Sequence, residues 1–185
     1  MELNTNKKTN YRWIVCGFLW VAVAVNYVDR TALSAATPII MKEFNIDGTE
    51  MGIIMAAFFW AYALLQVPMG YIADKFGQRI VYSIAVAWWS IAQMCIAVCS
   101  SLFGFVTARL FLGVGEAGSY PCNVGVVSKW FPKHERSRAT AIFDSASKFG
   151  NAFAMPVVVG LITMFTWHAP FLIFGAIGIV WAILW

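Results

Sequence analysis

Four ionisable side chains interrupt stretches of this chain that are otherwise apolar enough to lie in lipid: Asp29, Arg30, Arg109 and Glu116. A charge at bilayer depth is expensive, so such residues usually mark the path of an ion or a substrate. Desolvation favours the neutral form of a carboxylic acid, and a guanidinium group binds a carboxylate through two parallel hydrogen bonds. The four residues therefore predict chemistry that couples protons to an anion.

The composition supports a membrane setting for these charges. Of 185 residues, 61% are hydrophobic and 12% are charged, with a mean hydropathy of +0.71. A soluble domain is roughly half apolar and about a quarter charged. We therefore expect an integral membrane protein whose surroundings are the lipid bilayer. The net charge of +4 does not indicate a nucleic-acid partner, because most of the basic residues lie in short loops.

Apolar runs predict six helices, since about 20 residues are needed to cross the hydrocarbon core. We place the spans at 13–37, 50–72, 80–99, 102–126, 138–162 and 168–185. Pro38 is expected to help end the first. The predicted fold class is an all-α membrane protein with one transmembrane domain, 1–185.

The loops predict the orientation of these helices. Basic residues gather on the side of the N-terminal tail: Lys7, Lys8, Arg12, Lys75, Arg79, Lys129, Lys133, Arg136 and Arg138. The opposite side has only Lys42. Short loops rich in Lys and Arg stay cytoplasmic, so we expect a cytoplasmic N-terminus in a bacterial inner (plasma) membrane. A cleaved signal peptide is the alternative, but five further spans follow the first apolar run.

Metal and redox chemistry find little support. The four cysteines and two histidines show no spacing typical of metal ligands or of a disulfide framework. We expect no metal and no cofactor, with the proton as the coupling ion.

The connection between the second and third predicted helices reads Gly70-Tyr-Ile-Ala-Asp74-Lys75-Phe-Gly77-Gln-Arg79. Gly77 permits a tight turn, and the two cations hold the loop in the cytoplasm. Asp74 can oppose the positive N-terminal end of a neighbouring helix. The alternative interpretation is an ordinary turn between two spans, which needs only a glycine and some positive charge.

This segment resembles the signature G-x-x-x-D-(K/R)-x-G-x-(K/R) of the major facilitator superfamily. Arg109-Leu-Phe-Leu-Gly113-Val-Gly115-Glu116 is similar to its R-x-x-x-G-x-G pattern. The stretches Tyr27-Val-Asp29-Arg30, Glu116-Ala117 and Trp130-Phe-Pro-Lys-His-Glu135-Arg136 resemble the anion:cation symporter family, whose members include proton-coupled sugar-acid transporters of the D-galactonate type.

The resemblance implies a fold and several roles. The fold is the N-terminal half, a 3+3 inverted repeat, of a twelve-helix transporter, whose C-terminal half, or a second chain, would be the partner. Substrate hydroxyls would contact Tyr27, Tyr62 and Ser147. The residues of the signature would form a conformational gate: Gly70, Asp74, Lys75, Gly77 and Arg79. Asp144 and Lys148 are not typical of the galactonate group, which leaves the particular substrate open.

Helical projection gathers polar side chains on four helices. The stripes are Asn26, Arg30, Ser34 and Thr37; Tyr62 and Gln66; Arg109, Gly113, Glu116, Tyr120 and Asn123; and Asp144, Ser147, Lys148 and Asn151. Arg109 and Glu116 are two turns apart, about 10 Å along the axis, so their long side chains can meet or share a bound ion. Four such stripes predict the wall of a water-filled cavity.

The charges of this cavity balance when all are ionised: Arg30, Arg109, Lys148, Asp29, Glu116 and Asp144. Protonation of Asp29 and Glu116 leaves two excess positive charges and frees an arginine to take a substrate carboxylate. We therefore expect these two acids to be the proton sites. Arg30 is the predicted carboxylate anchor, and Arg109 is predicted to modulate Glu116 and touch the substrate.

Several of these residues have a structural alternative. Asp29 and Arg30 would lie at the outer interface if the first helix ended near Val28. Asp144 and Lys148 are an i, i+4 pair that can neutralise itself. Three more can be ordinary interhelical hydrogen-bonding groups: Tyr62, Gln66 and Asn123.

The sequence thus predicts a secondary active transporter that imports an organic anion by proton symport, with a sugar acid (hexonate, hexuronate or glucarate) as cargo. An aromatic or other small carboxylate is the alternative cargo. A truncated half that completes no transport cycle is the alternative function, because alternating access rocks one bundle against another. A membrane enzyme would need a nucleophile with a partner base, which the spans do not offer. The paired arginines disfavour an efflux transporter for cationic drugs.

Overall fold

The computed structural model describes residues 11–185, so Lys7 and Lys8 lie outside the described residues. The described part contains seven α-helices: α1 (Tyr11–Phe44), α2 (Gly48–Phe76), α3 (Gln78–Ile96), α4 (Leu102–Glu116), α5 (Ser119–Trp130), α6 (Lys133–Met164) and α7 (Ala169–Leu184). No strand occurs between residues 11 and 185, and the predicted all-α class is confirmed.

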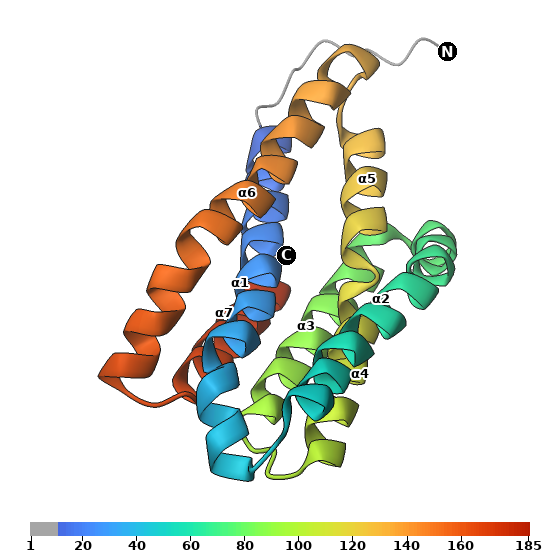
Figure 1. The fold of residues 1–185 in the computed structure, drawn as a ribbon. Helices are drawn as coiled ribbons and strands as arrows, with labels where there is room; N and C mark the ends of the chain where they lie inside the picture. The colour runs from blue at the N-terminus through green and yellow to red at the C-terminus, as the bar shows by residue number, and fades with distance from the viewer. Residues whose placement is uncertain (1–10) are drawn as a thin grey trace, which may run out of the picture.

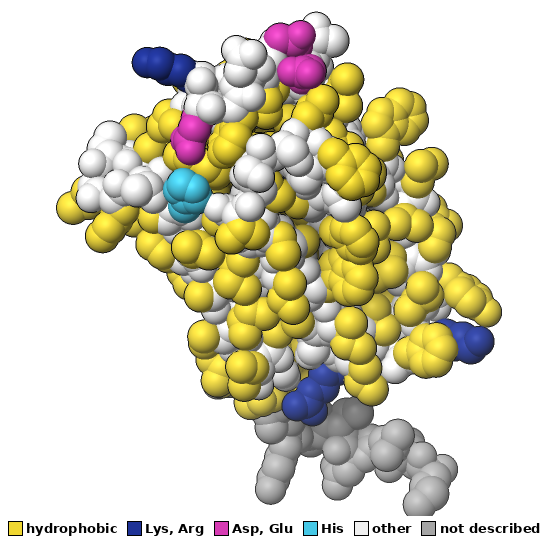
Figure 2. All heavy atoms as spheres, turned by 90° about the horizontal axis from the view of Figure 1, so that it is seen from below, with side chains coloured by type: hydrophobic (Ala, Val, Ile, Leu, Met, Phe, Trp, Pro, Cys, Tyr) yellow, Lys and Arg dark blue, Asp and Glu magenta, His cyan; other side chains and the backbone are white. Residues whose placement is uncertain are grey.

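Four of these helices are long and apolar enough to cross a membrane: α1, α2, α3 and α6. The helix α7 is apolar and shorter, and α4 and α5 follow one another through the predicted fourth span. Large hydrophobic side chains cover the outside, with Val67 and Phe103 among the most exposed. Figure 2 shows hydrophobic side chains over most of one view, with charged groups near its margins. This surface suits lipid rather than water.

The helices pack in a pattern that an inverted repeat produces. The most extensive pairings join α1 to α6, α2 to α4, and α3 to α7. If the first three spans are superposed in order on the last three, the α1–α6 pairing falls on the α2–α4 pairing. The α3–α7 pairing falls on itself. In Figure 1 the connections after α1, α3 and α6 lie at the lower end of the bundle, opposite the connection between α5 and α6. The arrangement agrees with the expected 3+3 repeat.

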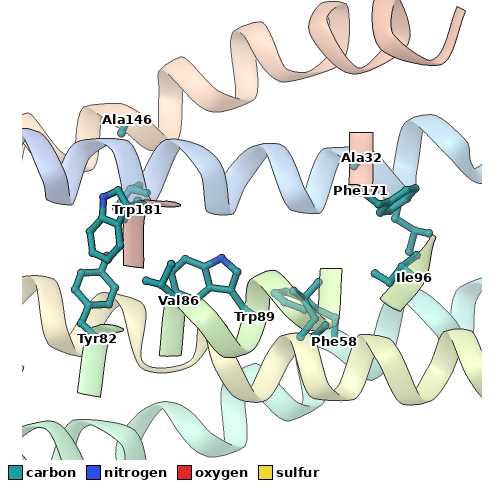
Figure 3. Close-up of a cluster of buried hydrophobic side chains, with 14 of the residues drawn as sticks. Ala32, Phe58, Tyr82, Val86, Trp89, Ile96, Ala146, Phe171 and Trp181 are labelled. Atoms are coloured by element: carbon teal, nitrogen blue, oxygen red, sulfur yellow. The ribbon is translucent and has the colours of Figure 1, made fainter. Parts of the chain in front are cut away.

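The pairing of α3 with α7 illustrates how the core is filled. The rings of Tyr82 on α3 and Trp181 on α7 meet edge to face, with centroids 5.0 Å apart. Val86 and Trp89 follow along α3, and all four side chains are buried (Figure 3). Aromatic contacts of this kind add to the packing between the two three-helix units.

The first helix ends later than its sequence predicts. Pro38 lies inside α1, which continues to Phe44. Proline is tolerated within membrane helices because neighbouring groups compensate for the lost hydrogen bond. The actual end is at Asn45, which has φ 53°, and the N–H of Ile46 donates to the carbonyl of Met41 at 3.0 Å. This is the Schellman arrangement, with asparagine in the left-handed position.

The second helix begins with a complete capping box. The Asp47 side chain accepts from the Glu50 N–H at 2.7 Å, and the Glu50 side chain accepts from the Asp47 N–H at 3.0 Å. Both acids thereby satisfy N–H groups at the start of α2. The acidic residues of this connection therefore have a structural role.

The predicted fourth span is divided in two. Ala117 and Gly118 separate α4 from α5, although both keep right-handed helical torsions. Pro121 has no N–H to offer the carbonyl of Ala117 four residues earlier, so one helical hydrogen bond is missing there. The interruption directly follows Glu116, which is the last residue of α4.

The predicted loop before the fifth span is also mostly helical. Phe131 and Pro132 alone separate α5 from α6, which begins at Lys133 rather than at 138. Arg136 on α6 reaches back and donates to the carbonyls of Phe131 and Ser128, at 3.0 and 2.6 Å. Arg136 thus caps the C-terminal end of α5, and no long loop separates the two helices.

Candidate functional site

An ion pair between α1 and α4 is the central feature of the site. Arg30 donates from Nε to Oε2 of Glu116 at 2.9 Å, and its Nη2 lies 2.9 Å from the same oxygen. The Glu116 side chain is fully buried, whereas 22% of the Arg30 side chain stays exposed. The sequence predicted that Arg109 and Glu116 could meet or share a bound ion. The structure pairs it with Arg30.

Aromatic rings surround the Arg30 guanidinium. Its Cζ atom lies 4.7 Å from the ring centre of Tyr62, 4.9 Å from that of Phe58 and 5.2 Å from that of Tyr27. The ring centre of Phe58 also lies 4.6 Å from Cζ of Arg109, so one ring contacts two arginines. Such contacts stabilise a partly desolvated cation. Phe58 was not among the predicted site residues, although it precedes Tyr62 by one helical turn.

A glycine on α4 makes this arrangement possible. A Cβ atom on Gly113 would lie 2.5 Å from the carbonyl oxygen of Phe58 and 2.9 Å from Cβ of Ala61. The absence of a side chain therefore lets α4 approach the backbone of α2. This approach places Phe58 close to both arginines.

Asp29 and Arg109 lie deeper than Arg30. Asp29 has no exposed surface, and Arg109 retains 3% exposure. Neither carboxylate oxygen of Asp29 has a hydrogen-bond partner within residues 11–185, and the same holds for Nε and Nη1 of Arg109. The charged neighbours of Asp29 are Glu116, Arg109 and Arg30. Because α1 continues to Phe44, the alternative that placed Asp29 at the outer interface does not apply.

A cavity of about 80 Å³ lies beside the ion pair. Its polar lining comes from α1, α2, α5 and α6: Asn26, Tyr27, Arg30, Tyr62, Ser119, Tyr120, Asn123 and Asp144. Asn123 is fully buried, and both polar atoms of its amide lack partners among the described residues. At about 30 Å³ for each water, the cavity holds two or three.

Four predicted site residues meet at this cavity: Tyr27, Arg30, Tyr62 and Asn123. Glu116 does not line the cavity but is hydrogen-bonded to Arg30, which does. The other predicted contacts do not line it. Ser147 is buried, and its hydroxyl donates to the carbonyl of Asp144 at 2.7 Å.

Two predicted contacts lie apart from the cavity. Lys148 is exposed on α6, and no ion pair within the described chain joins it to Asp144. Gln66 is partly exposed on α2, one turn beyond Tyr62. The mutual neutralisation of Asp144 and Lys148 therefore finds no support in this geometry.

The predicted gate motif connects α2 to α3. Gly77 is the single residue between them and has φ 92°, a torsion that side-chain-bearing residues rarely adopt. Asp74 accepts from Nε2 of Gln78 at 3.0 Å, and Oε1 of Gln78 accepts from Lys129 on α5. Gln78, which the sequence analysis did not single out, thus links the ends of three helices. Gly70 lies against Pro121, whereas Lys75 and Arg79 are exposed.

The described residues include no group of three His, Cys, Asp or Glu side chains that could hold a metal ion. The cavity and the ion pair present carboxylates, guanidinium groups and hydroxyls. These groups can exchange protons and bind an anion.

Apolar helices with charged side chains between them define a multi-pass integral membrane protein. The chain belongs to the Major Facilitator Superfamily, whose sequence model matches residues 19–185. Because this family consists of transporters, the prediction that the chain is not an enzyme is confirmed.

Curated relatives agree with the family assignment. The chain is 35% identical over 185 residues to the D-galactonate transporter of Escherichia coli O6:H1, covering 100% of this chain and 43% of that protein. It is 33% identical to the probable galactarate/D-glucarate transporter GudP of Bacillus subtilis, covering 97% of this chain and 41% of the relative. It is 33% identical to the hexuronate transporter of Escherichia coli K12, covering 94% of this chain and 40% of the relative. The chain thus spans about two fifths of the length of these relatives.

Solved structures show the same fold. A bacterial homologue of the human lysosomal transporter Spinster, in an inward-facing and occupied conformation, superposes with a TM-score of 0.85 over 96% of this chain and 44% of that one, at 23% identity. At this identity the likeness concerns the fold alone.

Proposed function

We propose that this chain forms the N-terminal six-helix domain of a secondary transporter that imports a sugar acid together with protons. The observation that carries the proposal is the Arg30–Glu116 ion pair, in which a buried carboxylate holds a partly exposed guanidinium beside a polar cavity. The names of the relatives, transporters of galactonate, glucarate and hexuronate, support a sugar acid as cargo.

The proton and the anion bind different members of this pair: the proton binds Glu116 and the anion binds Arg30. While Glu116 is ionised, it occupies the donors of Arg30. A proton on Glu116 removes the negative charge and releases those donors for a substrate carboxylate. The incoming anion in turn compensates the charge of Arg30, which is costly to leave unpaired at this depth. The two ligands therefore favour each other's binding, which is the thermodynamic requirement of symport.

Other residues complete the proposed site. Tyr27 and Tyr62 offer hydroxyls beside Arg30, and Asn123 offers an unpartnered amide. A sugar acid needs more room than about 80 Å³, so we infer that these residues form one wall of a larger chamber. Gln66, Ser147 and Lys148 are proposed to belong to that wall where it extends away from the ion pair. A second six-helix half, or a second chain, would supply the opposite wall, as alternating access requires.

The orientation is also part of the proposal. Basic residues of the described chain gather at the end where α5 meets α6, and Arg12 there pairs with Glu135 at 3.0 Å. We infer that this end faces the cytoplasm, in accord with the positive-inside rule. The motif from Gly70 to Arg79 would then lie on the cytoplasmic side and act as a conformational gate.

Uptake measurements test the proposal. The complete protein that contains this chain, reconstituted in liposomes, is given D-galactonate, D-glucarate, a hexuronate or an aromatic carboxylate, with and without an acidic exterior. We expect the sugar acids to accumulate only with the pH gradient and a protonophore to abolish the accumulation. Equal uptake with and without the gradient would contradict proton symport, and preference for the aromatic acid would contradict the proposed cargo.

A further inference from the structure

A second polar side chain meets Asp29 from α3. Gln93 has no exposed surface, and its Nε2 donates to the backbone carbonyl of Asp29 at 3.4 Å. Its Oε1 is buried and has no hydrogen-bond partner among the described residues, and neither does either carboxylate oxygen of Asp29. Buried polar atoms without partners are rare, so each calls for an explanation. Here an acceptor and a carboxyl group, both unpartnered, occur on side chains whose residues are in contact.

The hydrogen-bonding capacity of the carboxyl group depends on its proton. An ionised carboxylate only accepts, whereas a neutral carboxylic acid also donates through its O–H group. The amide N–H of Gln93 is already directed to the Asp29 carbonyl, so the side chain offers Asp29 an acceptor. That acceptor complements the neutral acid and repels the ionised one.

The charged surroundings of Asp29 act on the ionised form instead. They are Arg30 on α1, and Arg109 and Glu116 on α4. Arg109 has two donor nitrogens without partners among the described residues, so it favours a carboxylate, while Glu116 opposes one. Gln93 on α3 thus favours the protonated form of Asp29, whereas Arg109 favours the ionised form.

We propose that Gln93 is a positioning residue for proton coupling: its Oε1 accepts the hydrogen bond of protonated Asp29 and sets how tightly that proton is held. This rests on the proposed proton symport, with Asp29 as the second proton site that the sequence predicts. When the proton leaves, the acceptor of Gln93 loses its donor, and the carboxylate is drawn towards Arg109. The proton thereby moves the preferred partner of Asp29 from α3 to α4.

The same helix provides a matched control. Ser90 lies one turn before Gln93, is also buried, and its hydroxyl oxygen also lacks a partner among the described residues. This oxygen faces α7, because a Cβ atom built on Gly178 would collide with it. Ser90→Ala therefore removes a buried hydroxyl of α3 without touching Asp29.

An infrared titration of the complete protein in lipid tests the proposal without any substrate. The band of the protonated Asp29 carboxyl is the one that Asp29→Asn removes. In Gln93→Met, which has similar length and no amide acceptor, we expect the pH of half-protonation to fall by about one unit, a tenfold loss of proton affinity. Ser90→Ala should leave it unchanged. An unchanged or higher midpoint in Gln93→Met would overturn the role of Gln93.

A second measurement uses the unsubstituted protein. The side-chain amide band of Gln93 should shift as the Asp29 carboxyl band grows, and the shift should be absent in Asp29→Asn. If the Asp29 band appears without any amide shift, the inference about Gln93 fails while the proton site remains. If no Asp29 band appears at any pH that the fold tolerates, the proposed proton site itself fails.

Discussion

Arg30 and Glu116 are 86 residues apart in the chain, yet Nη2 of the arginine lies 2.9 Å from Oε2 of the glutamate. The contact joins the first three-helix unit to the second at the last residue of α4. Because the carboxylate is fully buried and the guanidinium is not, the arginine is the member that an incoming solute can reach. The pair is therefore well placed to open when either a proton or an anion arrives.

The shape of the Arg30 side chain should matter as much as its charge. In Arg30→Lys the positive charge remains, but the planar fork and its stacking against Tyr62 and Phe58 are lost. We expect the dissociation constant for a sugar acid to rise about tenfold or more, equivalent to about 1.4 kcal/mol. Binding is measured by calorimetry on the complete protein in detergent.

Arg138→Lys is the control for this substitution. Arg138 also lies over an aromatic ring, with Cζ 5.4 Å from the ring centre of Trp13, but it does not line the cavity. Its replacement should leave the affinity unchanged. An equal loss of affinity in both variants would show that Arg30 acts through its general contribution to packing.

The close approach of α4 to α2 should be sensitive to a single methyl group. In Gly113→Ala the new Cβ would meet the backbone carbonyl of Phe58, which cannot move as a side chain does. We expect a destabilisation of about 1–3 kcal/mol, seen as a lower unfolding temperature in detergent.

Gly160→Ala on α6 is the matched substitution, since nothing lies within 4 Å of the added atom. Alanine is the better helix former, so this variant should be neutral or more stable by up to about 1 kcal/mol. A similar loss of stability in the two variants would mean that Gly113 has no special packing role.

The proposed orientation predicts which residues a membrane-impermeant thiol reagent reaches. In a background with Cys95→Ser and Cys99→Ser, Thr49→Cys should react in intact cells, because the first turn of α2 is expected to lie outside. Lys133→Cys should react only after the membrane is opened. Both positions are exposed. The reverse pattern would place the N-terminus outside.

Much of the fold could be predicted because hydrocarbon thickness fixes the length of a span and the motif around Gly77 fixes a turn. The residues at which helices end are harder to predict. Pro38 suggested an end that the helix does not have, since a proline inside a membrane helix costs less than in water. Asn45, in the left-handed position, was the better signal. The break after α4 has its own signal in Pro121, which lacks the N–H that a continuous helix needs.

Four residues named from the sequence lie together at the cavity, but the contacts between helices could not be read from the sequence: Tyr27, Arg30, Tyr62 and Asn123. Projection of one helix placed Arg109 and Glu116 on the same stripe, but it could not reveal that Arg30 from another helix reaches Glu116 first. Asp29 and Arg30 are adjacent in sequence, which suggests a shared position. About 100° of helical rotation separates them, which leaves Arg30 at the cavity and Asp29 inside the bundle. Tertiary packing decides such matters.

Glu116→Gln offers the most direct test of the claim that a proton on Glu116 frees Arg30 for the anion. Glutamine imitates the protonated acid in size and charge and cannot lose the proton. The variant in liposomes should still exchange internal for external D-galactonate, while proton-driven accumulation falls to the level without a gradient. Accumulation equal to that of the unsubstituted protein would contradict the account.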